Sequence, residues 1–257
     1  MLILLPPSEG KSAPATGAPA DLDALWRPEL ARHRRRVLTK LVAMCGRGST
    51  RGVNASLATL GLTAGQHPEV TRNAGLLTAP AAPASEVYSG VLYEALGFAD
   101  LPPAAQEWVA GRAVVFSGLW GAVRLSDRIP AYRCSAGVTL PGLGGLTPYW
   151  KKALTPALNR TEGPILDLRS GAYAAMWTPS APAVAVRVLH ERVADGVAKR
   201  SVVSHFNKAT KGRLVRSLAL VSAEPRTVDE LVEALRDLKH TVEERSPGQL
   251  DLIVKDL

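Results

Sequence analysis

An apolar segment that leads directly into a polar loop constrains the fold of this chain most. Residues 113–116 are uniformly apolar, and residues 117–133 then combine glycines, aromatic residues and charged side chains. Glycine lets the backbone turn sharply, whereas Arg124, Asp127 and Arg133 are costly to bury without partners. We therefore expect a buried strand that ends in a ligand-binding loop, with no particular reaction indicated.

Other short apolar runs predict the remaining strands of a sheet. They cover residues 2–5, 164–168, 183–189 and 201–205, with 250–254 as a candidate edge strand. Helices are expected over residues 21–44 with a break at 27–28, and over 55–64, 88–96, 102–110, 147–158 and 227–240. Because strands and helices do not alternate strictly, we expect an α+β fold: a single domain over residues 1–257, with a mixed β-sheet surrounded by helices and a basic cleft.

The charge balance indicates an anionic partner. The chain has 31 Lys and Arg against 23 Asp and Glu, a net charge of +8 that attracts polyanions. The excess is concentrated in residues 27–51, where Glu29 is the only acid, and in residues 199–216, which contain none. Charge runs of this kind usually form solvated faces. In residues 27–51, we expect one polar side of a helix to carry Arg32, Arg34, Arg35, Arg36 and Lys40.

Composition also excludes several classes of protein. Cys45 and Cys134 have neither disulfide-framework nor zinc-site spacing, so no metal or cofactor is expected. The first seven residues lack the basic segment of a signal peptide, and no apolar run is long enough for a membrane helix. We expect a cytoplasmic protein.

Polar side chains follow four of the predicted strands, and ligand sites often gather at strand ends. If these loops converge, they form one electropositive cleft. The candidate residues for binding nucleic acid or another anion are Lys11, Arg124, Arg133, Lys151, Arg169, Lys208, Lys211 and Arg213. If the cleft performs chemistry, the candidates are Ser117, Asp127, Arg133, Asp167 and Tyr173.

Several familiar motifs are only partly present. Gly10-Lys11-Ser12 lacks the first glycine of a P-loop, because Leu5 occupies that position. Ser117 lies outside a Gly-x-Ser-x-Gly elbow, which disfavours a serine hydrolase pairing Ser117 or Ser170 with His205. Asp127 and Asp167 could each pair with an arginine, act as a base or bind a metal.

A helical segment at about residues 29–77 has the outline of a helix-hairpin-helix, a module that offers backbone N–H groups to DNA phosphates. Two helices that merely pack together, joined by a glycine, explain the same pattern. Residues 149–151, Tyr-Trp-Lys, suit base stacking or, equally, a helix that buries its two aromatic residues.

Taken together, these stretches resemble the YaaA family, also called the peroxide stress protein family, over almost the entire chain. The resemblance rests on Pro7 and Lys11, Tyr88-Ser89-Gly90-x-x-Tyr93, Ser117-Gly118-Leu119-Trp120-Gly121 with the residues up to Arg133, Trp150, the stretch 167–173 and Lys208-x-x-Lys211-Gly212. Asp167 and Ala172 replace the family's usual Asn and Glu, so the chain is identified as a divergent member.

The resemblance implies a small cytoplasmic protein linked to hydrogen peroxide resistance and to lowering free intracellular iron. It also implies a positively charged cleft and a helix-hairpin-helix-like element that binds double-stranded DNA. The leading hypothesis is a stress protein that binds the DNA backbone in its cleft. The alternative is an enzyme acting on a nucleotide or another anionic small molecule there, while iron sequestration lacks ligand spacing in the sequence.

Overall fold

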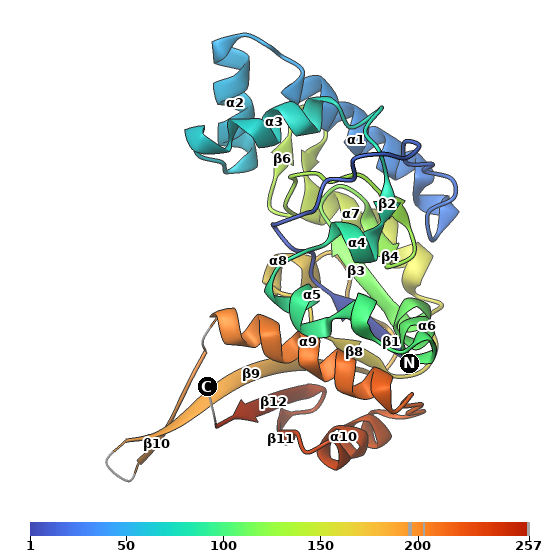
Figure 1. Cartoon of the computed structure of the whole chain (residues 1–257), viewed down its shortest axis with the longest axis vertical. Helices are drawn as coiled ribbons and strands as arrows, with labels where there is room; N and C mark the ends of the chain where they lie inside the picture. The colour runs from blue at the N-terminus through green and yellow to red at the C-terminus, as the bar shows by residue number, and fades with distance from the viewer. Residues whose placement is uncertain (195–196, 203, 256–257) are drawn as a thin grey trace.

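The computed structural model describes residues 1–194, 197–202 and 204–255, and a mixed β-sheet lies at its centre (Figure 1). The strands of this sheet are β1 (Leu2–Leu5), β3 (Ala113–Ser117), β4 (Gly121–Arg124), β8 (Ile165–Asp167), β9 (Ala183–Ala194), β10 (Val197–Ser201), β11 (Thr241–Ser246) and β12 (Gln249–Val254). Their order is β11-β12-β9-β8-β1-β3-β4, and β10 pairs with β9. β1 is parallel to β3 and β8, and β9 to β8 and β12, whereas β4, β10 and β11 run antiparallel to their neighbours. The predicted mixed sheet is confirmed.

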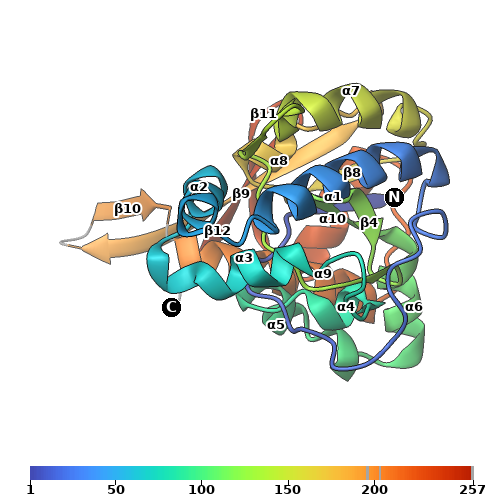
Figure 2. The same cartoon turned by 90° about the horizontal axis from the view of Figure 1, so that it is seen from above.

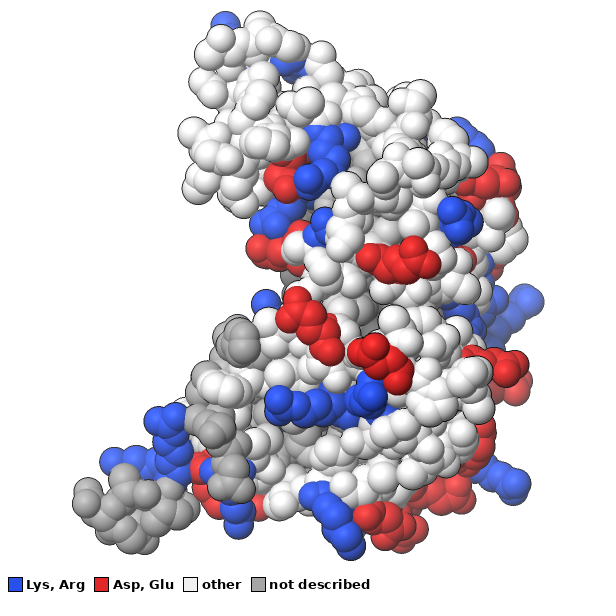
Figure 3. All heavy atoms as spheres, viewed as in Figure 1, with Lys and Arg blue, Asp and Glu red and all other residues white. Residues whose placement is uncertain are grey.

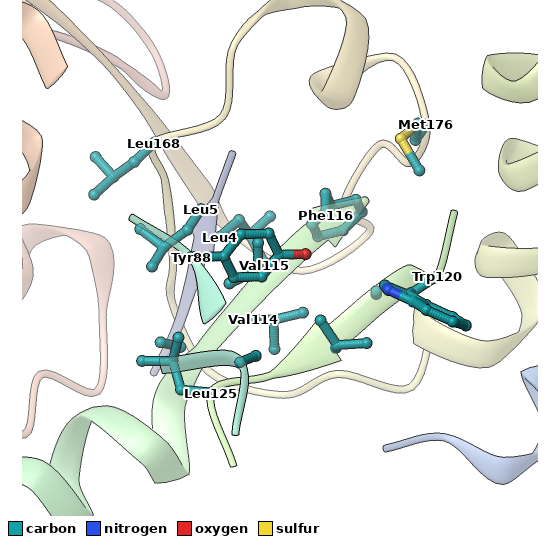
Figure 4. Packing of buried hydrophobic residues seen from close by; sticks show 14 of the residues in the cluster. Leu4, Leu5, Tyr88, Val114, Val115, Phe116, Trp120, Leu125, Leu168 and Met176 are labelled. Atoms are coloured by element: carbon teal, nitrogen blue, oxygen red, sulfur yellow. The ribbon is translucent and has the colours of Figure 1, made fainter. Parts of the chain in front are cut away.

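The central strands are apolar at nearly every position because helices cover both faces of the sheet. Every residue of β1 and β3 is buried. Leu4 and Leu5 of β1 pack with Val115 and Phe116 of β3 and with the ring of Tyr88 (Figure 4).

Helices surround this sheet, as predicted. They are α1 (Ala31–Cys45), α2 (Thr50–Leu60), α3 (His67–Ala74), α4 (Ala84–Val87), α5 (Val91–Leu96), α6 (Pro103–Arg112), α7 (Leu146–Leu158), α8 (Gly171–Ala174), α9 (Ser204–Leu220) and α10 (Val228–Asp237), with 3-10 turns at Pro28–Leu30, Ala64–Gln66 and Phe98–Asp100. Seen from above, α7 lies on one side of the sheet and α5, α6 and α9 on the other (Figure 2). Short pairs β2 (Ala82–Pro83) with β5 (Arg128–Ile129), and β6 (Thr139–Leu140) with β7 (Gly144–Gly145), stand apart from the sheet.

Four sequence-based predictions of local structure were wrong. The loop after residue 117 contains β4, because Gly121 adopts φ 74° and returns the chain antiparallel to β3. Residues 204 and 205 of the predicted strand 201–205 instead begin α9, and residue 203 lies outside the described part. β12 is not an edge strand, because β11 covers its outer side, and residues 21–27 form turns rather than helix.

The position of Arg34 also differs from the prediction that its side chain lies on the solvated face of a helix. Arg32, Arg35, Arg36 and Lys40 are exposed, whereas Arg34 is fully buried. Its guanidinium donates to the backbone carbonyls of Trp26 at 2.5 Å, Ala122 at 2.8 Å and Trp120 at 3.1 Å, and to those of Arg27 and Leu25. This arginine therefore holds α1 against β4 and the preceding loop.

None of the helices in the described residues is sufficiently long and apolar to cross a lipid bilayer.

Candidate functional site

The sheet topology creates a natural binding position at the carboxyl ends of β1 and β8. These strands are neighbours, but the chain leaves β1 towards β3 on one side and leaves β8 towards β9 on the other. In sheets of this kind, a crevice forms where the connections diverge.

A cavity of about 700 Å³ lies at this position. The space-filling view is hollowed between the α2–α3 helices and α9, with both positively and negatively charged side chains along the hollow (Figure 3). The cavity is lined by the loop after β1 (residues 6–11), residues 89–93 at the start of α5, residues 132–135, the loop after β8 (Leu168, Ser170, Tyr173), the end of α2 (Leu60, Gly61), and Val202, Asn207, Lys208 and Lys211 in or beside α9.

Lys11 lies on the wall of this cavity. The loop that carries it is fixed by an antiparallel bridge between Lys11 and Tyr88 and by a hydrogen bond from Ser12 N to Val87 O. Its ammonium donates to the carbonyl of Ser8 at 2.6 Å and lies 4.3 Å from the ring centroid of Tyr132. Burial, and then the nearby charge of Arg133, lower the pKa of Lys11 to about 7. No helix follows this loop over residues 12–27, unlike the helix that follows a P-loop.

A buried chain of three hydroxyls supports the aromatic wall behind Lys11. Tyr132 Oη lies 2.6 Å from Ser117 Oγ and 2.9 Å from Tyr88 Oη. Ser117 is fully buried and accepts from the backbone N–H groups of Leu119 and Trp120, so it fixes the β3–β4 turn. Burial raises the pKa of both tyrosines, which keeps their hydroxyls protonated.

Arg133 reaches the rim of the cavity beside Glu9. Its guanidinium is paired with Glu9 at 2.9 Å, and the Glu9 side chain is 81% exposed, so this pair is open to solvent. The backbone of Arg133 is held from both sides by Asn73, which donates to its carbonyl and accepts from its N–H. Through Asn73, helix α3 therefore fixes the position of Arg133.

The loop after β8 is organised by a buried ion pair. Arg169 bonds both oxygens of Asp167, at 2.9 and 2.6 Å, and also donates to the carbonyls of Tyr173 and Trp177. This arrangement occupies both Asp167 and Arg169 within the protein. It orients Tyr173 into the cavity lining, and burial raises the pKa of Tyr173 to about 12.

Helix α9 supplies two lysines and an amide to the cavity. Lys208 is exposed, whereas Lys211 donates to the carbonyl of Leu168 at 2.8 Å and has its pKa lowered by burial. Asn207 Oδ1 is buried and has no hydrogen-bond partner among the described residues. Since a buried acceptor without a donor is costly, Asn207 offers a contact for a ligand.

The structure brings together some predicted site residues and separates others. Lys11, Arg133, Tyr173, Lys208 and Lys211 line the cavity. Arg124 instead donates to the carbonyls of Ala110 and Gly111, and Asp127 accepts from the backbone N–H groups of Trp26 and Arg124. Lys151 on α7 and Arg213 on α9 are exposed outside the lining, and Ser117 lies behind Tyr132.

Sequence reasoning did not select Tyr88, Tyr132 or Asn73 as site residues. Tyr88 and Tyr132 stand inside recognisable motifs, but only the folded chain shows that their hydroxyls meet. The side chain of His205, considered above as a partner for a serine, lies outside the described residues. Among the described side chains, no group of three or more His, Cys, Asp or Glu is arranged to hold a metal ion.

The chain is similar to known proteins over its whole length. Residues 1–245 match the family described as peroxide stress protein YaaA. A UPF0246 protein of Streptomyces coelicolor is 48% identical over 269 residues, covering 100% of both chains. UPF0246 proteins of Corynebacterium efficiens and Corynebacterium glutamicum are 42% and 38% identical, each over 95% of both chains.

Proposed function

The chain belongs to the YaaA peroxide stress protein family, and we propose that it limits peroxide damage in the cytoplasm by binding the backbone of double-stranded DNA at the cavity. Lysine and arginine side chains at the rim would contact phosphates, so binding would depend little on base sequence.

One observation carries this proposal: four basic side chains from three separate parts of the chain line a single cavity. Lys11 comes from the loop after β1, Arg133 from the segment after β5, and Lys208 and Lys211 from α9. Among the described residues that line the cavity, Glu9 is the only acid. A chain with a net charge of +8 adds a long-range attraction for a polyanion.

The helical segment at residues 29–77 also supports double-stranded DNA as the partner. It contains α1, α2 and α3, and the end of α2 at Leu60 and Gly61 borders the cavity. Gly61 has φ 67°, and a side chain at this position would meet open space within 4 Å, so the backbone of the turn is approachable. A duplex lying along the rim would therefore pass close to this turn.

A second function is favoured by the interior of the cavity. Lys11, Tyr132 and Asn207 all line the cavity, and this set of a lysine, a tyrosine and an unpaired amide oxygen is more elaborate than contact with a DNA backbone requires. An enzyme acting on a nucleotide or another anionic small molecule would use such a pocket.

Competition binding tests the proposal against this alternative. Labelled duplex DNA is titrated with the protein at low salt, and unlabelled duplex or mononucleotides are then added. We expect duplex DNA of unrelated sequences to bind and to be displaced by duplex at concentrations where mononucleotides have no effect. Absence of duplex binding at low salt, or displacement by a mononucleotide at lower concentration than by duplex, would contradict DNA binding as the function.

A further inference from the structure

Lys11 is set apart from the other lysines of the cavity by its surroundings. Its Nζ lies over the rings of Tyr132 and Tyr88, 4.3 and 5.5 Å from the two centroids. Its hydrogen bond goes to a backbone carbonyl, that of Ser8, and no carboxylate in the described part of the chain forms a salt bridge with it. Lys208, by contrast, projects from an exposed position on α9.

The charged groups around Lys11 do not compensate its burial. Arg133 repels the ammonium, while the acid Glu9 is paired with Arg133 and Glu69 is paired with Arg72. Cys134 also faces Lys11, but burial raises the pKa of that thiol to about 12. With a pKa lowered to about 7, a large share of Lys11 is a neutral amine at physiological pH. A desolvated, neutral lysine is a nucleophile that condenses with aldehydes.

We propose that Lys11 forms an imine with an aldehyde held in this cavity, and that the aldehyde is the ring-opened sugar of an abasic site in DNA. This rests on the proposed function, because the flanking phosphates of the damaged strand would be held by Arg133 and Lys208 at the rim. A base-free sugar is easily turned out of a duplex, since it has no pairing or stacking to lose. A cavity of about 700 Å³ has room for it. Oxidative attack on DNA produces such sites, which connects the reaction to peroxide stress.

The step needs no oxidant or reductant. The lone pair of Lys11 Nζ attacks the C1′ carbonyl carbon, the new C–N bond forms, and the carbonyl electron pair moves to oxygen, which takes a proton. The carbinolamine hydroxyl takes up a proton and leaves as water; one of the two amine protons has been transferred to solvent, the other stays on nitrogen, and a protonated C=N bond remains. The ring of Tyr132 would stabilise the protonated imine, because its face attracts a cation.

Borohydride trapping tests this inference directly. The wild-type protein is mixed at saturating concentration with a duplex containing one abasic site, and borohydride reduces any imine to a stable secondary amine. We expect a covalent protein–DNA adduct that maps to the peptide containing Lys11, that is absent with an intact duplex, and that forms faster as the pH rises through about 7. Lys11→Arg retains a basic side chain that cannot form the imine and should lose the adduct, whereas the exposed Lys151→Ala should retain it.

The outcomes separate this inference from the proposed function. If the wild-type protein binds intact duplex but yields no adduct, or if the adduct maps to another lysine, the role of Lys11 is overturned while DNA binding stands. An adduct with a small sugar-phosphate aldehyde but none with the abasic duplex would overturn the assignment to DNA. If no duplex binds at all, the proposed function itself fails. Mapping the adduct in the wild-type protein keeps the test valid even if a Lys11 variant folds poorly.

Discussion

At the scale of single residues, similar basic side chains have opposite roles in this protein. Arg34 and Arg35 are adjacent on α1, yet Arg34 is fully buried and bonded to backbone carbonyls, while Arg35 pairs with Asp23 on the surface. Arg169 is similarly occupied by Asp167. A basic residue of this chain therefore contributes to anion binding only where its charge remains available at the cavity.

The buried role of Arg34 predicts a large effect on stability. Arg34→Met removes donors to buried carbonyls, so we expect the free energy of unfolding to fall by about 3 kcal/mol or more. Arg35→Met, which loses a surface ion pair, should cost no more than about 1 kcal/mol. Denaturant titration of both variants measures the difference, and equal losses would contradict the anchoring role.

The environment of Lys11 predicts a pH-dependent contribution to stability. Its pKa is about 7 in the folded chain against an ordinary value of 10.5, so between these values the unfolded state binds more protons. Stability contributed by this residue must then rise with pH over that interval. We expect the free energy of unfolding of the wild type, minus that of Lys11→Met, to increase from pH 7 to pH 10. A difference that stays flat or falls would show that Lys11 is not desolvated.

At the scale of elements, the close packing of α9 against α5 positions the lysines of the cavity (Figure 1). Gly212 makes this approach possible, because a Cβ there would collide with the carbonyl of Leu92 and lie 2.9 Å from Leu96 N. Gly212 directly follows Lys211 in the motif noted in the sequence. The glycine therefore fixes the helix that carries the two basic side chains.

Two helical glycines provide a matched test of this packing. Gly212→Ala should lower the free energy of unfolding by about 3 kcal/mol, because the added methyl group forces α9 away from α5. Gly111→Ala in α6, where a Cβ meets nothing within 4 Å, should raise it by about 0.5–1 kcal/mol. Thermal or denaturant unfolding gives both values, and a loss of stability from both changes would argue against close contact as the cause.

The elements differ in how well the sequence predicts them, for physical reasons. β1 and β3 are recognisable because strands buried on both faces are uniformly apolar. β4 was missed because its four residues include a glycine and an arginine, and its strand geometry depends on pairing with β3. The start of α9 was assigned to a strand because the local apolar pattern cannot distinguish a short strand from a buried helix.

Prediction of the candidate site from the sequence is limited in the same way, because local patterns do not report tertiary contacts. Lys11, Arg133, Tyr173, Lys208 and Lys211 were selected as polar residues expected near strand ends, and all five line the cavity. The Ser117–Tyr132–Tyr88 hydroxyl chain joins residues 15 and 44 positions apart, so no local pattern reveals it. Networks of this kind depend on tertiary contacts rather than on spacing along the chain.

At the scale of the whole molecule, the sheet, the helices and the charge act together. The diverging connections of β1 and β8 open the cavity, α9 and the loop after β1 bring lysines to it, and the net charge of +8 favours a polyanion. The central claim is that phosphates of duplex DNA bind at this cavity rather than over the basic surface in general. Lys208 and Lys151 are both exposed lysines, but only Lys208 lines the cavity, so they form a matched pair.

The most direct test is the salt dependence of duplex affinity for the wild type, Lys208→Ala and Lys151→Ala, measured by fluorescence anisotropy. Each phosphate contact adds roughly 0.9 to the slope of log affinity against log salt concentration. We predict a steep slope for the wild type, a slope smaller by about one for Lys208→Ala, and an unchanged slope for Lys151→Ala. A slope that is unaffected by Lys208→Ala, or reduced equally by both changes, would contradict phosphate binding at the cavity.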